Sequence, residues 1–453
     1  MPDHKPVIAI FDVGKTNKKL LLFDKYYKVV FEKSHRIPEI KDEDGFPCED
    51  MSALKKWICN SVEDLLAQKD FEIAAINFSA YGASFVLVDG DLNPVAPMYN
   101  YLKPFPNQLL KAFYSKYGGE LNFSIATASP ALGNLNSGLQ LYRLKYQQPA
   151  VFLRTKYALH LPQYISGIIT KEFYSDLTSI GCHTALWDFN ADEYHKWVKE
   201  ESVLEKLAPI VSSSSTTEKK TNSGIIKIGA GLHDSSAALI PYLRQFSEEF
   251  ILISTGTWSI SLNPFNKQHI TAEELKSDCL CYLQYQGSPV KASRLFLGNE
   301  HELQLKRISE HFNVNEIAIL EFDYDSMLNT KNTKLFLVVE NEIPQFEFRN
   351  QDLSQYHHFS TAYLDLLFDL VRMQLWSTGI ILKNTSVRNI YVDGGFSNNK
   401  IFMQLLAAAF SQYKVFAAAI PQSTALGAAL AIHDSWNDQL LSDNLIELRS
   451  ISS

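Results

Sequence analysis

The sequence predicts an α/β protein built from two lobes, and three observations support this prediction. First, 453 residues exceed what one hydrophobic core usually serves, so two domains of roughly 200 to 250 residues each are expected. Second, strand-like and helix-like segments alternate along the chain, as in layered α/β domains. Third, an apolar strand, a short Gly/Thr turn and a second apolar strand occur near the start of the chain and again after residue 250. Two duplicated lobes facing one nucleotide would produce this repeat, and chance similarity is the alternative.

The first strand pair surrounds a polar turn at residues 14–17. The run from Val7 to Phe11 is apolar, rich in β-branched residues and ends at Asp12, so it predicts a buried hairpin with the run at 20–23. The patterns that follow predict strands at 73–78 and 85–88 and a helix at 51–68.

The polar stretch 212–223 has no hydrophobic period and predicts a surface loop or an insertion within a domain. After it, strand-like patterning resumes, and the second of the apolar runs encloses the turn Ser254 to Thr257. The elements predicted from there to the end are strands at 225–232, 250–262 and 389–392 and helices at 399–410 and 425–433.

Charge and cysteine content narrow the class of protein. With 42 Lys+Arg against 50 Asp+Glu, the formal net charge is −8 and no long basic run is present, so nucleic acid is a poor partner. Five scattered cysteines do not imply a disulfide framework. The N-terminus passes straight into a strand pattern without a signal peptide, and no window has the length of a membrane span. We therefore expect a cytoplasmic protein without a membrane partner.

Asp12 is the first candidate for phosphate chemistry. It follows a buried strand and precedes a Gly/Thr turn, where backbone N–H groups and Lys18 can face phosphate while the carboxylate holds hydrated Mg²⁺. An ordinary hairpin turn with a capping Asp is the alternative. The turn is not a Walker loop, because Ala9 stands where the first glycine of that loop would be.

Two further turns carry glycines and hydroxyls. The turn at residues 255–257 offers N–H and hydroxyl donors for the β/γ-phosphates, although tight hairpins use the same residues routinely. Gly394 and Gly395 follow a strand and precede a helix, where close backbone approach of a ligand and a helix N-terminus favour an anion or polar ring.

Asp234 is the candidate general base. It follows a strand and precedes a small-residue helix, and a carboxylate fixed there can accept a hydroxyl proton as the hydroxyl attacks phosphorus. The alternative is that Asp234 is a helix N-cap. The neighbouring His233 is more often a structural than a catalytic residue in such a position.

Together these residues resemble the FGGY family of carbohydrate kinases. The matching segments are FDVGKTNKKLLLFD (11–24), GLHDSSAA (231–238), ISTGTWSISL (253–262), VDGGFSNNKIFMQLLAAAF (392–410) and STALGAALAIH (423–433). They span nearly the whole chain. The resemblance implies two actin-like, ribonuclease H-like lobes with a cleft between them, an N-terminal sugar-binding domain (1–245) and a C-terminal nucleotide-binding domain (246–453).

The same resemblance assigns site residues. Asp234 would be the catalytic base, Asp12 would hold Mg²⁺, and the cofactors would be ATP and Mg²⁺. The nucleotide would be bound by Gly14, Thr16, Asn17, Lys18, Thr255, Gly256, Thr257, Gly394, Gly395, Asn399 and Gly427. The sugar would be bound by Tyr81, Gly82, Tyr101, His183, His233 and Asp234, with a buried structural role as the alternative for His183.

Residues 79–91 and 291–302 look closest to the rhamnulokinase-like branch of the family. Two departures concern the sugar. Tyr81 stands where relatives often carry Trp, and Tyr101 and Lys103 stand where an Asp/Arg pair is customary. The expected reaction is transfer of the γ-phosphate of ATP to a ketose or deoxyketose such as L-rhamnulose or L-fuculose. The alternatives are a sugar or nucleotide sensor without turnover and a phosphotransferase for a non-sugar substrate; monomer and homodimer both stay open.

Overall fold

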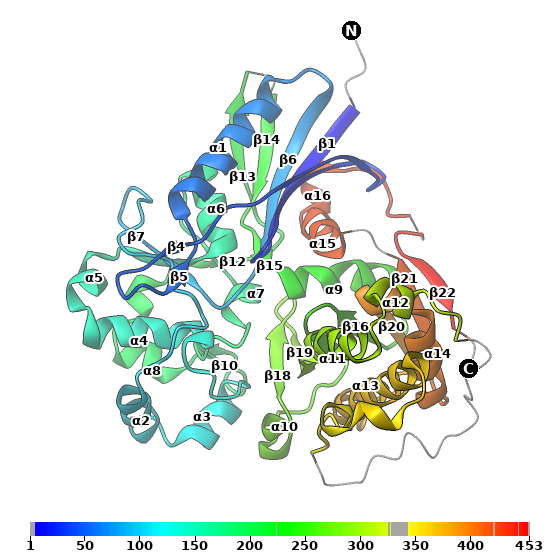
Figure 1. The fold of residues 1–453 in the computed structure, drawn as a ribbon. Helices are drawn as coiled ribbons and strands as arrows, with labels where there is room; N and C mark the ends of the chain where they lie inside the picture. Colours follow the sequence, from blue (N-terminus) through cyan, green and yellow to red (C-terminus); the bar gives the residue numbers. More distant parts are fainter. Residues whose placement is uncertain are drawn as a thin grey trace.

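The computed structural model describes residues 5–222, 224–324, 327, 343–419, 422–442 and 444–451. Two seven-stranded sheets, each flanked by helices, form the frame of this part of the chain (Figure 1). The first sheet is built from the first half of the sequence and the second from the second half. The predicted α/β class with two lobes is therefore confirmed.

The first sheet has the strand order β13-β14-β6-β1-β2-β3, with β15 paired to β6. Strands β1 and β2 form an antiparallel hairpin, and β6 lies parallel to β1. Residues 7–11 of β1 are fully buried because helices cover both faces of the sheet, which explains the uninterrupted apolar run. The strands are β1 (Lys5–Val13), β2 (Lys18–Asp24), β3 (Val29–His35), β6 (Phe71–Ala80), β13 (Thr216–Thr221), β14 (Gly224–Gly229) and β15 (Leu232–His233).

The second sheet has the order β18-β19-β17-β16-β20-β21-β22. Its path β19-β17-β16-β20-β21-β22 repeats the path β3-β2-β1-β6-β14-β13 of the first sheet, with the same parallel and antiparallel pairings. The repeat noticed in the sequence is thus a repeat of structure. The strands are β16 (Phe250–Thr255), β17 (Ser259–Asn263), β18 (Cys279–Leu283), β19 (Pro289–Leu295), β20 (Asn389–Gly394), β21 (Lys414–Ala419) and β22 (Glu447–Ser450).

Helix α1 (Met51–Ala67) illustrates how the sequence forms these layers. Asp50 accepts a hydrogen bond of 2.9 Å from the backbone N–H of Ala53 and caps the helix. Buried residues recur every three or four positions from Met51 to Leu65, so one face of α1 packs on the first sheet. Helix α6 (Leu161–Thr170) covers the same face of the sheet.

The opposite face of the first sheet is covered by α9 (Asp234–Gln245) and α15 (Ser423–Ala431). Helix α15 belongs to the last part of the chain, yet it packs beside α9 and against β1 and β6 (Figure 1). Other side chains of α9, Leu239 and Tyr242, pack against the second sheet. Helix α9 therefore lies between the two sheets and contacts both.

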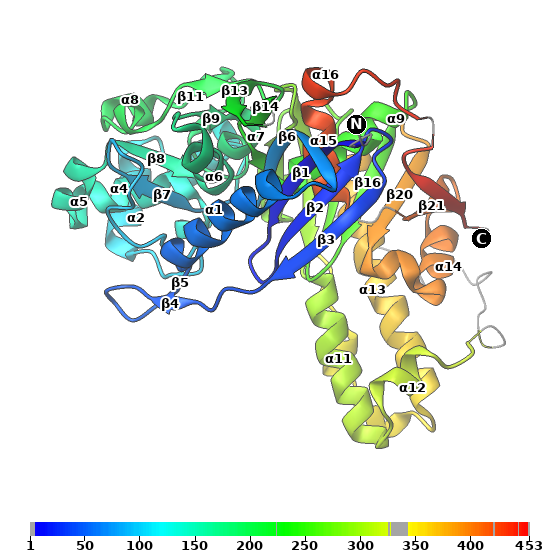
Figure 2. The same cartoon turned by 90° about the horizontal axis from the view of Figure 1, so that it is seen from above.

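The far face of the second sheet is covered by α11 (Leu297–Phe312), α13 (Phe359–Leu382) and α14 (Lys400–Ala409). Seen from above, α11, α12 (Glu316–Leu320) and α13 project together beyond that sheet (Figure 2). Helices α11, α13 and α14 would therefore form one side of any ligand site at the ends of β16 and β20, and the sheet would form the other side.

A mainly helical region joins β6 to the end of the first lobe, and its core is aromatic. The Phe113 ring lies 4.9 Å from that of Tyr142 and 5.3 Å from that of Trp197. Its elements are β7 (Phe85–Val88), α2 (Asn107–Lys116), α3 (Glu120–Ala126), α4 (Ser137–Gln147), α5 (Pro149–Arg154), β8 (Tyr157–His160) and α8 (Lys196–Glu200). The remaining short elements are β4 (Ile40–Lys41), β5 (Pro47–Cys48), β9 (Ser175–Asp176), α7 (Leu177–Ile180), β10 (Trp187–Asp188), β11 (Glu193–Tyr194), β12 (Ile210–Val211), α10 (Ala272–Lys276) and α16 (His433–Trp436).

The prediction of a loop at residues 212–223 is wrong for half of its length, and Ser223 lies outside the described residues. Residues 216–221 form β13, which pairs antiparallel with β14 at the edge of the first sheet. An edge strand with both faces near solvent needs no apolar period, and its ladder hydrogen bonds come from the backbone. Composition alone therefore could not distinguish it from a loop.

Across the helices of the described ranges, we find none that combines the length and the apolar character needed to cross a membrane.

Candidate active site

Asp12 lies at the carboxyl end of β1. Its Oδ2 accepts a hydrogen bond of 2.7 Å from the hydroxyl of Thr424, at the start of α15. Burial raises the pKa of Asp12 to about 6; the charge of Asp234 acts in the same direction, and that of Lys19 opposes it. Two carboxylates from distant parts of the sequence are therefore close enough to interact.

Asp234 is the first residue of α9, and the N-cap position is held by His233. The backbone N–H of Ser235 donates to Asp234 Oδ1 at 2.6 Å, and His233 Nε2 lies 3.3 Å from the same oxygen. Burial raises the pKa of Asp234 to about 6. A carboxylate with this pKa is mostly ionised at neutral pH yet is a stronger base than an exposed one, which suits proton abstraction.

The first Gly/Thr turn joins β1 to β2, and the backbone N–H of Gly14 donates to the carbonyl of Asn17 at 3.0 Å. Thr16 and Asn17 are exposed at its tip, where Asn17 accepts from Arg36. This turn lies directly after Asp12, as predicted, and its polar groups face solvent rather than a core.

Lys18, which was predicted to face phosphate, does not lie with the exposed polar groups of this turn. Its ammonium is buried and lies 2.5 Å from Oε1 of Glu49, which is buried as well. In the hairpin register Asp12 stands opposite Lys19, and directly opposed residues of an antiparallel pair have their side chains on the same face. The cation that acts on Asp12 is therefore Lys19, which sequence reasoning missed and the hairpin register could have identified.

The second turn is tied to the Gly394–Gly395 turn through one side chain. The hydroxyl of Thr255 donates to the backbone carbonyl of Asp393 and accepts from the N–H of Phe396 at 3.1 Å. Gly394 has φ +80°, and a Cβ there would lie 1.8 Å from the carbonyl oxygen of Thr255. Only glycine allows this close approach of β16 and β20.

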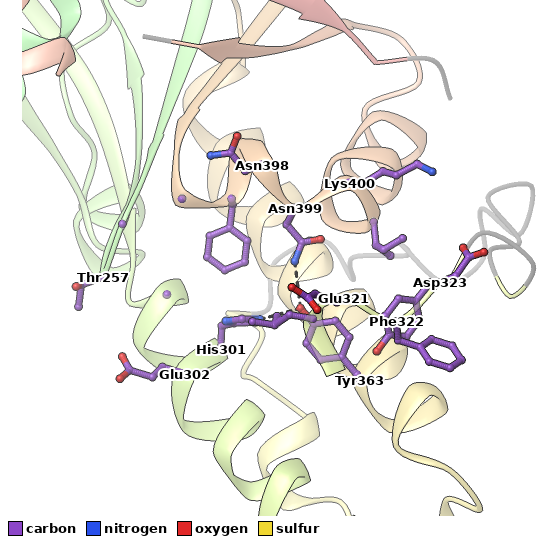
Figure 3. A pocket seen from close by; sticks show the side chains of 17 residues that line it. Thr257, His301, Glu302, Glu321, Phe322, Asp323, Tyr363, Asn398, Asn399 and Lys400 are labelled. Atoms are coloured by element: carbon purple, nitrogen blue, oxygen red, sulfur yellow. Dashed lines mark hydrogen bonds between the residues drawn. The ribbon is translucent and has the colours of Figure 1, made fainter. Parts of the chain in front are cut away.

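A cavity of about 780 Å³ opens beside these turns, and Figure 3 shows the side chains around it. Of the predicted nucleotide residues, the four that line it are Gly256, Thr257, Gly395 and Asn399. Sequence reasoning missed His301 of α11 and Tyr363 of α13, which line the cavity from the far wall. A cavity of this size fits a nucleotide-sized ligand.

On the first-lobe side, Tyr81 and Tyr101 lie near each other, with 6.4 Å between ring centroids. The Tyr81 hydroxyl donates to Glu49 Oε2 at 3.0 Å, and the ammonium of Lys15 lies 5.7 Å from the Tyr81 ring centroid. Burial raises the pKa of Tyr101; the charge of Lys15 opposes that rise, and the charge of Asp234 adds to it. The predicted sugar residues Tyr81 and Tyr101 are thus brought to the neighbourhood of Asp234.

Gly82 makes room for His233, because a Cβ at residue 82 would lie 2.7 Å from Cδ2 of the imidazole. Burial lowers the pKa of His233 to about 3, so the ring is neutral, and Nε2 lies 3.1 Å from the sulfur of Cys182. Its buried Nδ1 meets no hydrogen-bond partner in the described ranges. The unpaired Nδ1 belongs to the ring whose Nε2 lies 3.3 Å from Asp234, and an unpaired polar atom of this kind can accept a hydrogen bond from a hydroxyl-rich ligand or donate one to it.

His183 is buried, and its Nδ1 lies 3.1 Å from the carbonyl oxygen of Leu135. Burial and the charge of Arg294 lower the pKa of His183 to about 3. Arg294, on β19, reaches toward the first lobe, is paired with Asp278 at 2.6 Å and has a buried Nε without a partner among the described residues. Sequence reasoning overlooked this interlobe cation.

The described residues contain no group of three or more His, Cys, Asp or Glu side chains arranged to hold a metal ion. Asp12 and the hydroxyl of Thr424 are hard oxygen donors, however, and Mg²⁺ is commonly held by one or two carboxylates together with waters and substrate phosphates. The donor set therefore fits an ion that arrives with its nucleotide.

Comparison with known protein families shows to which family the chain belongs. The N-terminal domain of the FGGY family of carbohydrate kinases matches residues 7–240, and the C-terminal domain of carbohydrate kinase FGGY matches residues 247–439. The chain belongs to the FGGY family. A rhamnulokinase of Halalkalibacterium halodurans is 22% identical over 264 residues, which are 55% of this chain and 54% of that protein. The chain thus spans about half the length of the curated relatives that it matches.

Solved structures confirm the actin-like two-lobed fold expected of an FGGY chain. A carbohydrate kinase from Novosphingobium aromaticivorans superposes with a TM-score of 0.79 at 22% identity, covering 99% of this chain and 94% of the other. A ligand-bound xylulose kinase from Lactobacillus acidophilus gives 0.78 at 16% identity, covering 98% and 93%. At identities this low, the likeness to these structures shows the fold alone.

Gly427, predicted to bind nucleotide, does not line the cavity beside the glycine turns in this FGGY chain. It lies in α15, where a Cβ would be 1.8 Å from the backbone carbonyl oxygen of Ala237 in α9. The small side chains around it, including Ala425 and Ala429, are buried in the same contact. The structure gives the small-residue helix a packing role between α9 and the first sheet.

Proposed function

We propose that the chain is an ATP-dependent carbohydrate kinase that transfers the γ-phosphate of ATP to a hydroxyl of a small sugar. The observation that carries this proposal is the position of Asp234. Its charge acts on Asp12, at the phosphate turn, and on Tyr101, in the predicted sugar pocket. A base between these two groups can remove the hydroxyl proton as the oxygen attacks phosphorus.

The surroundings of Asp234 support its role as general base. Its raised pKa, about 6, makes it basic enough to share a proton in the transition state without being protonated at neutral pH. Asp12 would hold Mg²⁺, which neutralises phosphate charge when it is bound. Lys19 lies on the same side of the hairpin and adds positive charge there.

The nucleotide is proposed to bind in the cavity beside β16 and β20, with its phosphates toward Gly256 and Thr257 and its base toward Asn399. The open glycine turns let the ligand approach the backbone closely, and the cavity has the size of a nucleotide site. In this arrangement the triphosphate points from the second lobe toward Asp12.

For the sugar we propose a ketose or deoxyketose such as L-rhamnulose or L-fuculose, bound by Tyr81, Gly82, Tyr101, His183 and His233. Support comes from the rhamnulokinase name of the curated relatives. The xylulose kinase name of a structure with the same fold keeps other ketoses in the comparison. The unpaired Nδ1 of His233 is the atom we assign to a sugar hydroxyl.

A coupled assay of ADP release tests the proposal across ketoses, deoxyketoses and polyols. The expected result is ADP formation that depends on one of the sugars and on Mg²⁺. The Asp234→Asn variant, purified in the same way, controls for contaminating kinases. Binding of ATP and sugar without turnover in the parent protein would favour the sensor, and turnover only with a non-sugar acceptor would favour the other phosphotransferase.

We also propose that the domains divide at residues 245 and 246, between α9 and β16. The two family matches end at 240 and begin at 247, which supports this division. The proposed location is the cytoplasm, supported by five free cysteines in the described chain. Light scattering of the purified chain will distinguish a monomer from a homodimer.

A further inference from the structure

The turn that carries Asp234 lies against a short buried segment of the first lobe. This segment begins at Asp176, the last residue of β9, and continues through α7 to Cys182. Helix α7 packs beside β15, the short strand that ends at His233. The side chains of this segment are therefore next to the residue that precedes the proposed base.

Asp176 is a buried carboxylate surrounded by donors. Its Oδ1 accepts hydrogen bonds from the backbone N–H of Thr178 at 2.9 Å, from that of Ser179 at 3.3 Å, and from the hydroxyl of Thr178. Its Oδ2 accepts from the hydroxyl of Ser213. Burial raises the pKa of Asp176, and these four hydrogen bonds oppose that rise. Because both oxygens are bonded, the carboxylate is held in one orientation.

The hydroxyl of Thr178 has a second partner, and the chemistry of that partner fixes the direction of both bonds. The backbone N–H of His233 lies 2.9 Å from Thr178 Oγ1, and a backbone N–H can only donate. The hydroxyl oxygen therefore accepts from His233 and donates its own proton to Asp176. A chain of hydrogen bonds thus runs from a buried carboxylate to the backbone of the residue before Asp234.

A further contact from the same segment holds the side chain of His233, because Cys182 Sγ lies 3.1 Å from its Nε2. His233 is the N-cap of α9, yet it makes no side-chain capping hydrogen bond. Since the side chain of the N-cap residue does not fix the start of this helix, the position of Asp234 depends on the contacts that hold His233.

We propose that Thr178, held by Asp176, is a positioning residue for the proposed base: it fixes the backbone of His233 and with it the place of the Asp234 carboxylate relative to the sugar hydroxyl. The inference rests on the proposed function, since it takes Asp234 to be the base. Asp176 and Thr178 have no exposed surface, so we expect neither to touch a substrate. A misplacement of about 1 Å can cost about 10² in rate. Loss of the Thr178 hydroxyl should therefore reduce turnover and leave ground-state binding unchanged.

The test is the coupled assay of ADP release on the full chain, with kcat and the KM values for sugar and ATP measured separately. Thr178→Val replaces the hydroxyl by a methyl group of similar size, and Thr178→Ser keeps the hydroxyl. Thr155→Val is the matched control, because Thr155 is also buried, lies at the end of α5 and donates its hydroxyl proton to the carbonyl of Val151 at 2.9 Å. Melting curves show which variants are folded.

For Thr178→Val we expect kcat to fall about 10-fold to 100-fold, with both KM values within about twofold of the parent. Thr178→Ser should recover most of the turnover, and Thr155→Val should match the parent. In the Asp234→Asn background, Thr178→Val should add no further loss, because the group that it positions is already absent. A merely structural role would lower the rate in both backgrounds.

An unchanged kcat in folded Thr178→Val, or an equal loss in both backgrounds, overturns the inference; the proposed base still stands if Asp234→Asn is inactive. Should Thr178→Val not fold, Ser213→Ala takes its place, since it removes only the donor to Asp176 Oδ2. We expect a smaller loss of kcat in that variant, and an unchanged kcat overturns the inference too. Asp234→Asn with turnover within a few-fold of the parent overturns the proposed base and the inference with it.

Discussion

Replacing Asp234 by Asn tests the proposed base, and its expected effects on rate and on stability have opposite signs. The amide has nearly the same size and can still accept from the N–H of Ser235, which donates at 2.6 Å in the parent protein. It cannot take a proton from the sugar hydroxyl. General-base assistance is typically worth about 10² to 10⁴ in rate, so turnover should fall by that factor.

The effect on stability follows from the pKa of Asp234, which burial raises from 3.8 to about 6. Below pH 3.8 the carboxyl is neutral in both the folded and the unfolded chain, and its ionisation affects neither. Between pH 3.8 and pH 6 the carboxyl ionises in the unfolded chain but stays protonated in the folded chain. The free energy of unfolding therefore falls over this range and levels off above pH 6. The difference amounts to at most about 3 kcal/mol at pH 7.

About 30% of the Asp234 side chain is exposed, so solvent screening reduces this figure, and we expect the Asn variant to be about 1 to 2 kcal/mol more stable than the parent at pH 7. The gain should vanish at pH 3.5. The assays are turnover number and denaturant unfolding of both proteins at the two pH values. A folded variant with turnover within a few-fold of the parent would refute the assignment of the base, and an unchanged unfolding free energy at pH 7 would refute the buried, destabilised carboxylate.

Two further pairs of variants test the site. Lys18→Met should cost about 3 kcal/mol, because the buried Glu49 then keeps only the more distant ammonium of Lys15, 3.8 Å away, in place of its close ion pair. Lys19→Met should keep the melting temperature and raise the KM for ATP, and the reverse pattern would return the phosphate role to Lys18. Gly395→Val should fold and lose ATP affinity while sugar binding is retained, since no atom lies within 4 Å of its Cβ position, whereas Gly394→Val should yield insoluble protein; equal melting curves for both would contradict the close contact. Thermal melting and separate titrations with ATP and sugar measure these outcomes.

Most helices and strands could be predicted because the spacing of apolar residues and the turn residues nearby determine where they form. The strand at 85–88 was predicted with the bounds that β7 has, and the hairpin after Asp12 formed where an apolar run met a Gly/Thr turn. Edge strand β13 could not be predicted in this way, because its pairing with β14 uses backbone groups that every sequence carries. Elements that form through the burial of side chains could be predicted from the sequence, and an element that forms through backbone pairing alone could not.

The site residues divide along a different line. Gly394 was predicted from its turn, and the close approach to Thr255 explains why the turn needs it. His301 and Tyr363 were not predicted, because each lies in an amphipathic helix whose pattern records only which face is buried. Their meeting with Asn399 depends on how three helices pack, and a single sequence without relatives carries no local sign of that.

Gly427, which the sequence assigned to the nucleotide, packs its helix against the helix that carries the proposed base. The backbone of α15 meets that of α9 at Ala237, three residues after Asp234, and no side chain fits between them. Helix α9 also contacts the second sheet through Leu239 and Tyr242, and the Tyr242 hydroxyl donates to Asp393 at 3.3 Å. The proposed base therefore stands on a helix that is held by both lobes at once. Any closure of the lobes around the two substrates must move α9 relative to at least one sheet, so the distance from base to phosphorus is coupled to closure itself.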